Sequence, residues 1–277
     1  MVKINTKRGG EKMILLNLLK AHSDPKFVNS GIINWATPII SFGQISSAIV
    51  ATVGLNPSNL EFVDQSMNEL SGVNRRFHTF SSLGISSWEN IEEIQVNKIL
   101  EMNDNYFKNN PYDTWFKKLD YILGGSKFSY YFPISNACHI DIVPYATILK
   151  WNKLGSDDRE YLIKKSKDTL ALILKESQIS FLILNGQSVV DNFEKVSGVK
   201  FENHFEPKWD LTRKSGKNVK GKSYVGTISQ IGNIDLERNI KVIGYNHNIQ
   251  SSYGITKEVM DHIKNWVKSQ HNNYFNI

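Results

Sequence analysis

Two polar segments of the chain directly follow apolar, strand-like runs, the position at which α/β proteins place many of their active sites. The first, residues 51–58, reads Ala-Thr-Val-Gly-Leu-Asn-Pro-Ser and brings Asn56 to the end of the apolar run. The second, residues 242–252, places His247 between two asparagines. An amide can orient a partner by hydrogen bonds, and an imidazole can both hydrogen-bond and transfer a proton. Each segment alone also fits a structural role, as a tight Asn-Pro turn or a surface histidine.

Together, the two segments resemble the two motifs of the uracil-DNA glycosylase superfamily: a Gly-x-Asp/Asn-Pro loop after the first strand, and a histidine-containing loop before the last helix. Residues 74–77, Asn-Arg-Arg-Phe, are similar to the segment after the first motif in mismatch-directed members. Residues 181–193 are similar to the family's later strand–glycine–helix unit. The resemblance spans roughly residues 47–268, and the order of the motifs carries more weight than their letters.

The resemblance implies an enzyme that breaks the bond between a flipped DNA base and its sugar. That reaction develops positive charge on the sugar and negative charge on the departing base, and both need stabilisation. By the match, Asn56 positions the attacking water and His247 hydrogen-bonds O2 of the departing base. Many members have aspartate at the Asn56 position; an amide orients water but cannot take its proton, which implies slower chemistry.

Two further positions bear on which base is cut. Uracil-specific members have a tyrosine after the motif's proline that blocks bases with a C5 substituent, whereas here Ser58 leaves room. Their pocket strand ends in asparagine; in the similar segment here, residues 137–145, Asp141 stands at or near that place, with Asn136 as the competing assignment. A carboxylate accepts from an exocyclic amine such as cytosine N4. His139 and Asp141 equally fit one face of an alternating strand with structural hydrogen bonds.

A flipped base also needs an aromatic stacking partner. The candidates are Phe62, Phe77 and Phe80, each of which also fits an ordinary core position.

Basic residues give the candidate DNA contacts. Residues 208–222 carry six lysines and arginines against the single acid Asp210, which predicts an exposed basic hairpin that contacts phosphates or, alternatively, a solvated loop. We assign DNA contacts to residues in this hairpin and beside the two motifs: Arg75, Arg76, Arg213, Lys214, Lys217, Gln250 and Ser251.

Composition agrees with a polyanionic partner, because the formal net charge is +6. The single cysteine, Cys138, excludes an intramolecular disulfide and a cysteine-rich metal site, which fits a reducing cytoplasm. The apolar run at residues 13–19 is too short to span a bilayer. We therefore expect a cytoplasmic, soluble monomer that binds DNA, uses no metal or other cofactor, and contacts no membrane.

Strand-like and helical patterns alternate along the chain. The strand-like runs are residues 47–55, 129–133, 137–143, 180–185, 224–231 and 241–245, and the helical patterns are residues 88–102, 113–123, 157–176, 188–196 and 256–270. This alternation predicts one α/β domain over residues 1–277, a three-layer α/β/α sandwich with a mostly parallel central sheet and a basic insertion at about residues 208–222. The resemblance implies that this sandwich is of the uracil-DNA glycosylase type.

The sequence thus predicts a monofunctional DNA glycosylase. The favoured substrate is a C5-modified cytosine of the kind found in phage DNA, which would make the enzyme a defence protein. The alternatives are an ordinary uracil or mismatch repair glycosylase, and a catalytically weak DNA-binding protein on the same fold.

Overall fold

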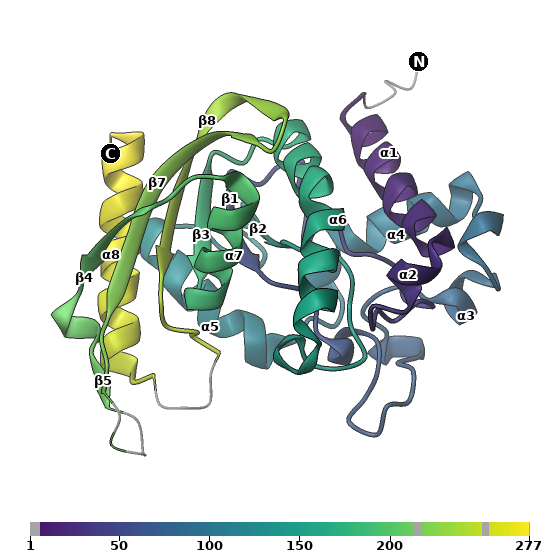
Figure 1. Cartoon of the computed structure of the whole chain (residues 1–277), viewed down its shortest axis with the longest axis horizontal. Helices are drawn as coiled ribbons and strands as arrows, with labels where there is room; N and C mark the ends of the chain where they lie inside the picture. Colours follow the sequence, from purple (N-terminus) through teal and green to yellow (C-terminus); the bar gives the residue numbers. More distant parts are fainter. Residues whose placement is uncertain (1–5, 213–215, 217, 251–254, 277) are drawn as a thin grey trace.

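A six-stranded sheet with the strand order β2-β1-β3-β8-β7-β4 forms the centre of the chain (Figure 1). The computed structural model describes residues 6–212, 216, 218–250 and 255–276. The strands are β1 (Val50–Gly54), β2 (Ala137–Asp141), β3 (Phe181–Asn185), β4 (Glu202–Phe205), β7 (Lys222–Ile231) and β8 (Ile234–Tyr245). Strands β2, β1, β3 and β8 pair in parallel, and β7 and β4 extend the sheet in antiparallel fashion.

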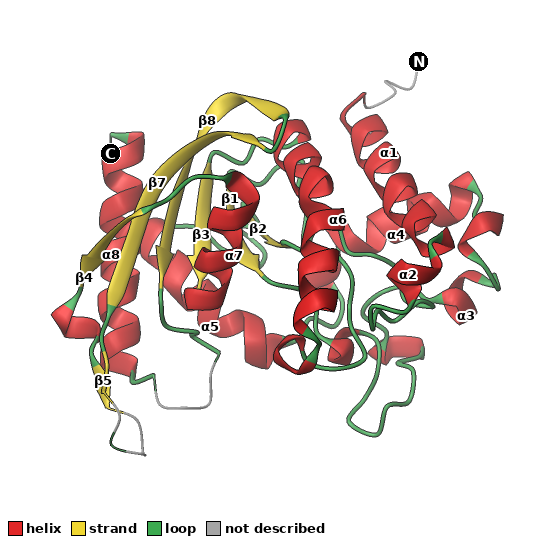
Figure 2. Cartoon of the chain, in the orientation of Figure 1, coloured by secondary structure: helices red, strands yellow, loops and turns green. Residues whose placement is uncertain are grey.

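Helices cover both faces of the sheet and complete three layers (Figure 2). The helices are α1 (Thr6–Lys20), α2 (Pro25–Val28), α3 (Phe80–Leu83), α4 (Glu93–Asp104), α5 (Asp113–Leu123), α6 (Ser156–Glu176), α7 (Gln187–Ser197) and α8 (Lys257–Phe275). Helices α1, α4, α6 and α7 share one apolar cluster with one face of the sheet, and α5 and α8 share a second cluster with the other. Among the described residues, none of the helices combines the length and the apolar character that a membrane span requires.

The two-residue period of β1 divides its side chains between the two clusters. Ala51 and Val53 belong to the cluster of α6 and α7, whereas Val50 belongs to that of α5 and α8. Thr52 and Gly54 therefore face α5 and α8, and in the parallel pairing they lie opposite His139 and Asp141 of β2. Polar groups of β1 and β2 are thus stacked on one face of the sheet.

The connections that leave β1 and β3, which are parallel neighbours, lead to opposite sides of the sheet. The chain leaving β1 leads to β2 on one side, and the chain leaving β3 leads towards β8 on the other. In open α/β sheets this arrangement opens a crevice beyond the carboxyl ends of the two strands, where ligands bind. The segment after β1 and the end of β3 flank this crevice.

Most of the predicted elements are present, and the exceptions have local causes. Residues 129–133 were expected as a strand but form turns, because the Asp120 carboxylate accepts hydrogen bonds from Ser129 Oγ and Tyr130 N, each at 2.8 Å. Strand β4 was not predicted, since its four residues are polar or exposed. Strand β8 begins at Ile234 instead of residue 241, so that it forms a long hairpin with β7.

The basic segment contains the predicted hairpin, in which β5 (Leu211–Thr212) pairs with β6 (Asn218–Val219) in antiparallel fashion. Trp209 anchors its base: the side chain is buried and packs edge-on against Trp266 of α8, with ring centroids 5.3 Å apart. Gly221 is required beneath it, because a Cβ there would lie 2.4 Å from Trp209 Cβ.

Candidate active site

Polar side chains from four segments converge at the carboxyl edge of the parallel strands. Asn56 follows β1, Asp141 is the last residue of β2, Asn185 is the last residue of β3, and His247 comes two residues after β8. The predicted catalytic pair is therefore brought to one edge of the sheet, with β3 between the two strands that carry it.

The Asn56 amide is held in one orientation by the segment after β2. Its Nδ2 donates to Tyr145 O at 3.4 Å and to Thr147 Oγ1 at 3.1 Å, and it also lies 3.0 Å from Pro57 O, a third acceptor, in its own segment. Thr147 Oγ1 gives its own proton to Leu149 O at 2.7 Å and so acts as an acceptor towards Asn56. Because all of these partners accept, the NH2 group must face them and the Oδ1 atom must face the other way. This is the orientation that an amide needs in order to accept a hydrogen bond from water.

The Asp141 side chain lies over the backbone of β1. It is 4% exposed, and its Oδ1 is 3.4 Å from His139 Nε2. A Cβ at Gly54 would lie 2.3 Å from Asp141 Oδ1 and 2.9 Å from His139 Nε2. Glycine at position 54 is therefore a condition for the placement of this carboxylate.

Asn136, the competing assignment, precedes β2 and lies at the opposite, amino end of that strand. Its Oδ1 accepts from Ser129 N at 3.1 Å, which ties it to the turn before the strand. The structure thus separates Asn136 from Asn56 and leaves Asp141 as the residue at the carboxyl edge.

Glu61 is a buried carboxylate near this edge that the sequence analysis missed. It is 2% exposed, and its Oε2 accepts from Tyr106 Oη at 2.8 Å. Burial raises the pKa of Glu61 to about 7; the Tyr106 hydrogen bond and the Arg76 charge oppose this rise, and the charge of Asp141 adds to it. A lone glutamate gives no sequence signal of its own burial.

Of the predicted stacking residues, Phe62 and Phe77 are buried core residues and Phe80 is partly buried. Phe62 and Phe77 are each 1% exposed and contact each other with centroids 5.7 Å apart. Phe77 stacks on Tyr106, and Phe80 packs against Trp88 in the other cluster. Ser58 is exposed, and its Oγ accepts from Leu60 N at 3.2 Å as the cap of a short 3-10 turn.

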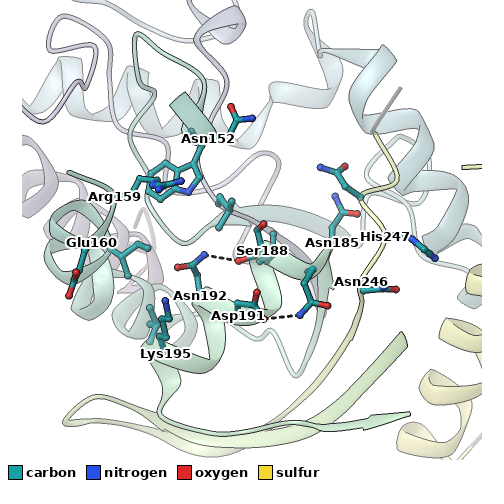
Figure 3. Close-up of a pocket in the computed structure, with 18 of the residues that line it drawn as sticks. Asn152, Arg159, Glu160, Asn185, Ser188, Asp191, Asn192, Lys195, Asn246 and His247 are labelled. Carbon is teal, nitrogen blue, oxygen red and sulfur yellow. Dashed lines mark hydrogen bonds between the residues drawn. The ribbon is translucent and has the colours of Figure 1, made fainter. Parts of the chain in front are cut away.

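His247 is buried and engaged by the base of the basic hairpin. Its Nε2 lies 2.6 Å from Trp209 O, and since a carbonyl only accepts, Nε2 is the protonated nitrogen in this contact. In Figure 3 the ring points away from the labelled residues of α6 and α7. The second motif is thus joined to the hairpin by a direct hydrogen bond.

A cleft of about 1100 Å³ opens beside the strand edge between α6 and α7 (Figure 3). Its lining includes Asn185, Asn246 and His247 from the strand edge. Four basic side chains and two carboxylates line it. The basic residues are Arg159, Lys164, Lys167 and Lys195. An excess of positive charge next to the candidate site suits a polyanion.

The residues predicted to contact DNA differ in whether they already make hydrogen bonds within the protein. Arg76 donates to Asn110 O and Leu60 O at 3.0 and 2.5 Å, so its guanidinium serves internal carbonyls. Gln250 accepts from Asn185 Nδ2 at 2.6 Å, an internal contact as well. Arg75 is partly buried, and its Nε has no hydrogen-bond partner in the described structure. Arg213, Lys214, Lys217 and Ser251 lie outside the described residues.

The sequence matches no known protein family and no curated protein. Membership of the uracil-DNA glycosylase superfamily therefore stays a prediction. Among the described residues, no group of three or more His, Cys, Asp or Glu side chains is placed to hold a metal ion.

Replacing Gly54 with alanine should displace the Asp141 carboxylate and cost about 1–3 kcal/mol in the free energy of unfolding, as for overpacked cores. Gly124→Ala is the matched control, because a Cβ there meets no atom within 4 Å. Urea unfolding of both variants measures the difference. Equal stability of the two variants would show that position 54 tolerates a side chain.

The buried Glu61 carboxyl predicts a loss of stability as pH rises. The folded chain holds this proton up to about pH 7, whereas the unfolded chain releases it near 4.5, so the stabilisation is complete below 4.5 and lost by about 7. Glu61→Gln cannot titrate, so its free energy of unfolding should rise relative to that of the wild type by on the order of 3 kcal/mol across that window. Urea unfolding at a series of pH values measures the difference; parallel curves would contradict the assignment.

Proposed function

We propose that the chain is a monofunctional DNA glycosylase that hydrolyses the bond between a flipped base and its deoxyribose. The observation that carries the proposal is the fixed orientation of Asn56 at the end of β1, one strand from the buried Asp141 carboxylate. The Asn56 amide can accept a hydrogen bond from an attacking water, and the Asp141 carboxylate can accept one from the edge of a base. The cation-lined cleft and the basic hairpin beside this edge support DNA as the partner.

In the proposed reaction the bond from sugar C1′ to the base breaks and its electron pair leaves with the base. The oxygen of one water bonds to C1′, and the water's proton passes to solvent while the base takes up a proton. Asn56 Oδ1 accepts a hydrogen bond from this water and fixes its position without removing its proton. The product is an abasic site and a free base.

His247 is proposed to stabilise the negative charge on the departing base. Its Nε2 proton is given to Trp209 O in this structure. The role therefore requires that bound DNA draw the ring away from the hairpin, so that the Nε2 proton turns to the base.

The proposed substrate is a C5-modified cytosine, and a defence role against modified phage DNA follows from it. Ser58 is small and exposed, so it presents no bulk to a C5 substituent. Asp141 accepts from the N4 amine of cytosine, whereas O4 of uracil would place two acceptors together.

A second candidate function is DNA binding without efficient catalysis. The hydrogen bond of His247 to Trp209 favours it, because that bond occupies the nitrogen that would otherwise face a base. Base release distinguishes the two functions.

Asn56→Ala and His247→Ala should each reduce base release by roughly 100-fold or more while DNA affinity stays nearly unchanged, since both groups act on the transition state. Asn233→Ala, in the turn between β7 and β8 at the opposite edge of the sheet, is the matched control. Single-turnover release and a separate binding titration measure the two quantities. Equal losses of binding and release would count against these roles.

Base preference should respond to Ser58 and Asp141 in different ways. Matched duplexes would contain uracil, thymine, cytosine, 5-hydroxymethylcytosine or its glucosylated form. The wild type should prefer a modified cytosine, Ser58→Tyr should close the site to the C5 substituent, and Asp141→Asn should shift preference towards uracil by roughly 10-fold or more. Fastest release of uracil by the wild type would replace this substrate with ordinary uracil repair.

A further inference from the structure

Four buried polar side chains form a continuous row beneath the strand edge. The Tyr130 hydroxyl hydrogen-bonds Thr52 Oγ1, which lies 2.7 Å from His139 Nδ1. His139 Nε2 in turn lies 3.4 Å from Asp141 Oδ1. Each of these residues is at most 4% exposed, so no bulk water stands between them.

The carboxylate at one end of the row fixes the direction of its protons. Burial raises the pKa of the Tyr130 phenol well above its usual value, so this hydroxyl keeps its proton and can donate it. A carboxylate only accepts, so the proton on His139 Nε2 faces Asp141. With Nε2 protonated, a neutral imidazole accepts at Nδ1, and Thr52 must donate to it. Thr52 then accepts from Tyr130, and every contact runs from Tyr130 towards Asp141.

Packing holds the His139 ring in the plane that this row requires. Trp115 and Phe116 of α5 contact the ring edge-on, with centroids 5.0 and 5.5 Å away, and Phe42 contacts it at 5.4 Å. On the side of β1, the missing side chain of Gly54 makes room for the Nε2 atom. The ring is therefore held by contacts from three separate segments.

We infer that His139 is a positioning residue that holds the Asp141 carboxylate as an aimed hydrogen-bond acceptor and thereby sets the preference for a base bearing an exocyclic amine. This inference rests on the proposed glycosylase function. The His139 contact uses one of the several acceptor sites of the carboxylate and leaves others for the amine. Without the imidazole, the carboxylate loses its internal donor and turns, so the amine loses its partner.

The test compares 5-hydroxymethylcytosine with 5-hydroxymethyluracil in matched duplexes, two bases that differ at position 4 and share the C5 substituent. His139→Phe should reduce the preference for the cytosine form by roughly 10- to 100-fold, the range for loss of one buried polar partner. His139→Gln, which keeps an N–H donor, should retain most of it. An unchanged preference in folded His139→Phe would overturn the inference.

A spectroscopic measurement needs no base release and covers the case in which His139→Phe does not fold. Ring ¹⁵N shifts of His139 in the free protein should report the Nε2-protonated tautomer in the wild type and in Thr52→Ser. Asp141→Ala removes the acceptor that faces Nε2 and should abolish the single tautomer. An Nδ1-protonated or doubly protonated ring in the wild type would overturn the inference.

The two proposals fail in different ways. If the wild type releases no base from any duplex, the glycosylase function is wrong, and the ring tautomers still decide whether His139 positions Asp141. If base is released normally and the tautomer is the opposite one, the glycosylase function stands and the role of His139 is wrong.

Discussion

The parallel register of β1 against β2 is the constraint on which the candidate site depends. It sets Thr52 opposite His139 and Gly54 opposite Asp141, so that polar groups of two strands meet on one buried face. A one-residue slip would turn both β2 side chains into the apolar cluster beneath α6 and α7. Burial of a charged group among apolar side chains is costly, so the same polar residues that form the site also penalise the wrong register.

Segments other than their own help to hold the two proposed catalytic residues. Asn56 follows β1 but is oriented by Tyr145 and Thr147, which follow β2. His247 follows β8 but is held by Trp209, which begins the basic hairpin. Orientation by neighbouring segments makes the strand edge one connected unit, because movement of either segment changes the direction of a candidate group.

The sequence predicts the parallel strands and the covering helices well, since buried parallel strands are continuous apolar runs and the helices have clear periodicity. It does not predict β4, whose residues are exposed. It did not decide whether Asp141 or Asn136 is the pocket residue, because that choice depends on how β2 is aligned with β1. It missed Glu61, whose burial depends on Tyr106 from a distant segment, and the contact of His247 with Trp209, for the same reason.

The most direct test of the proposed activity is mass spectrometry of the free bases released when the purified chain is incubated with genomic DNAs that carry different natural base modifications. We predict release of a C5-modified cytosine from DNA that contains it, and its loss in Asn56→Ala. Release of uracil alone would contradict the proposed substrate. Release of no base from any of these DNAs would contradict the proposed function.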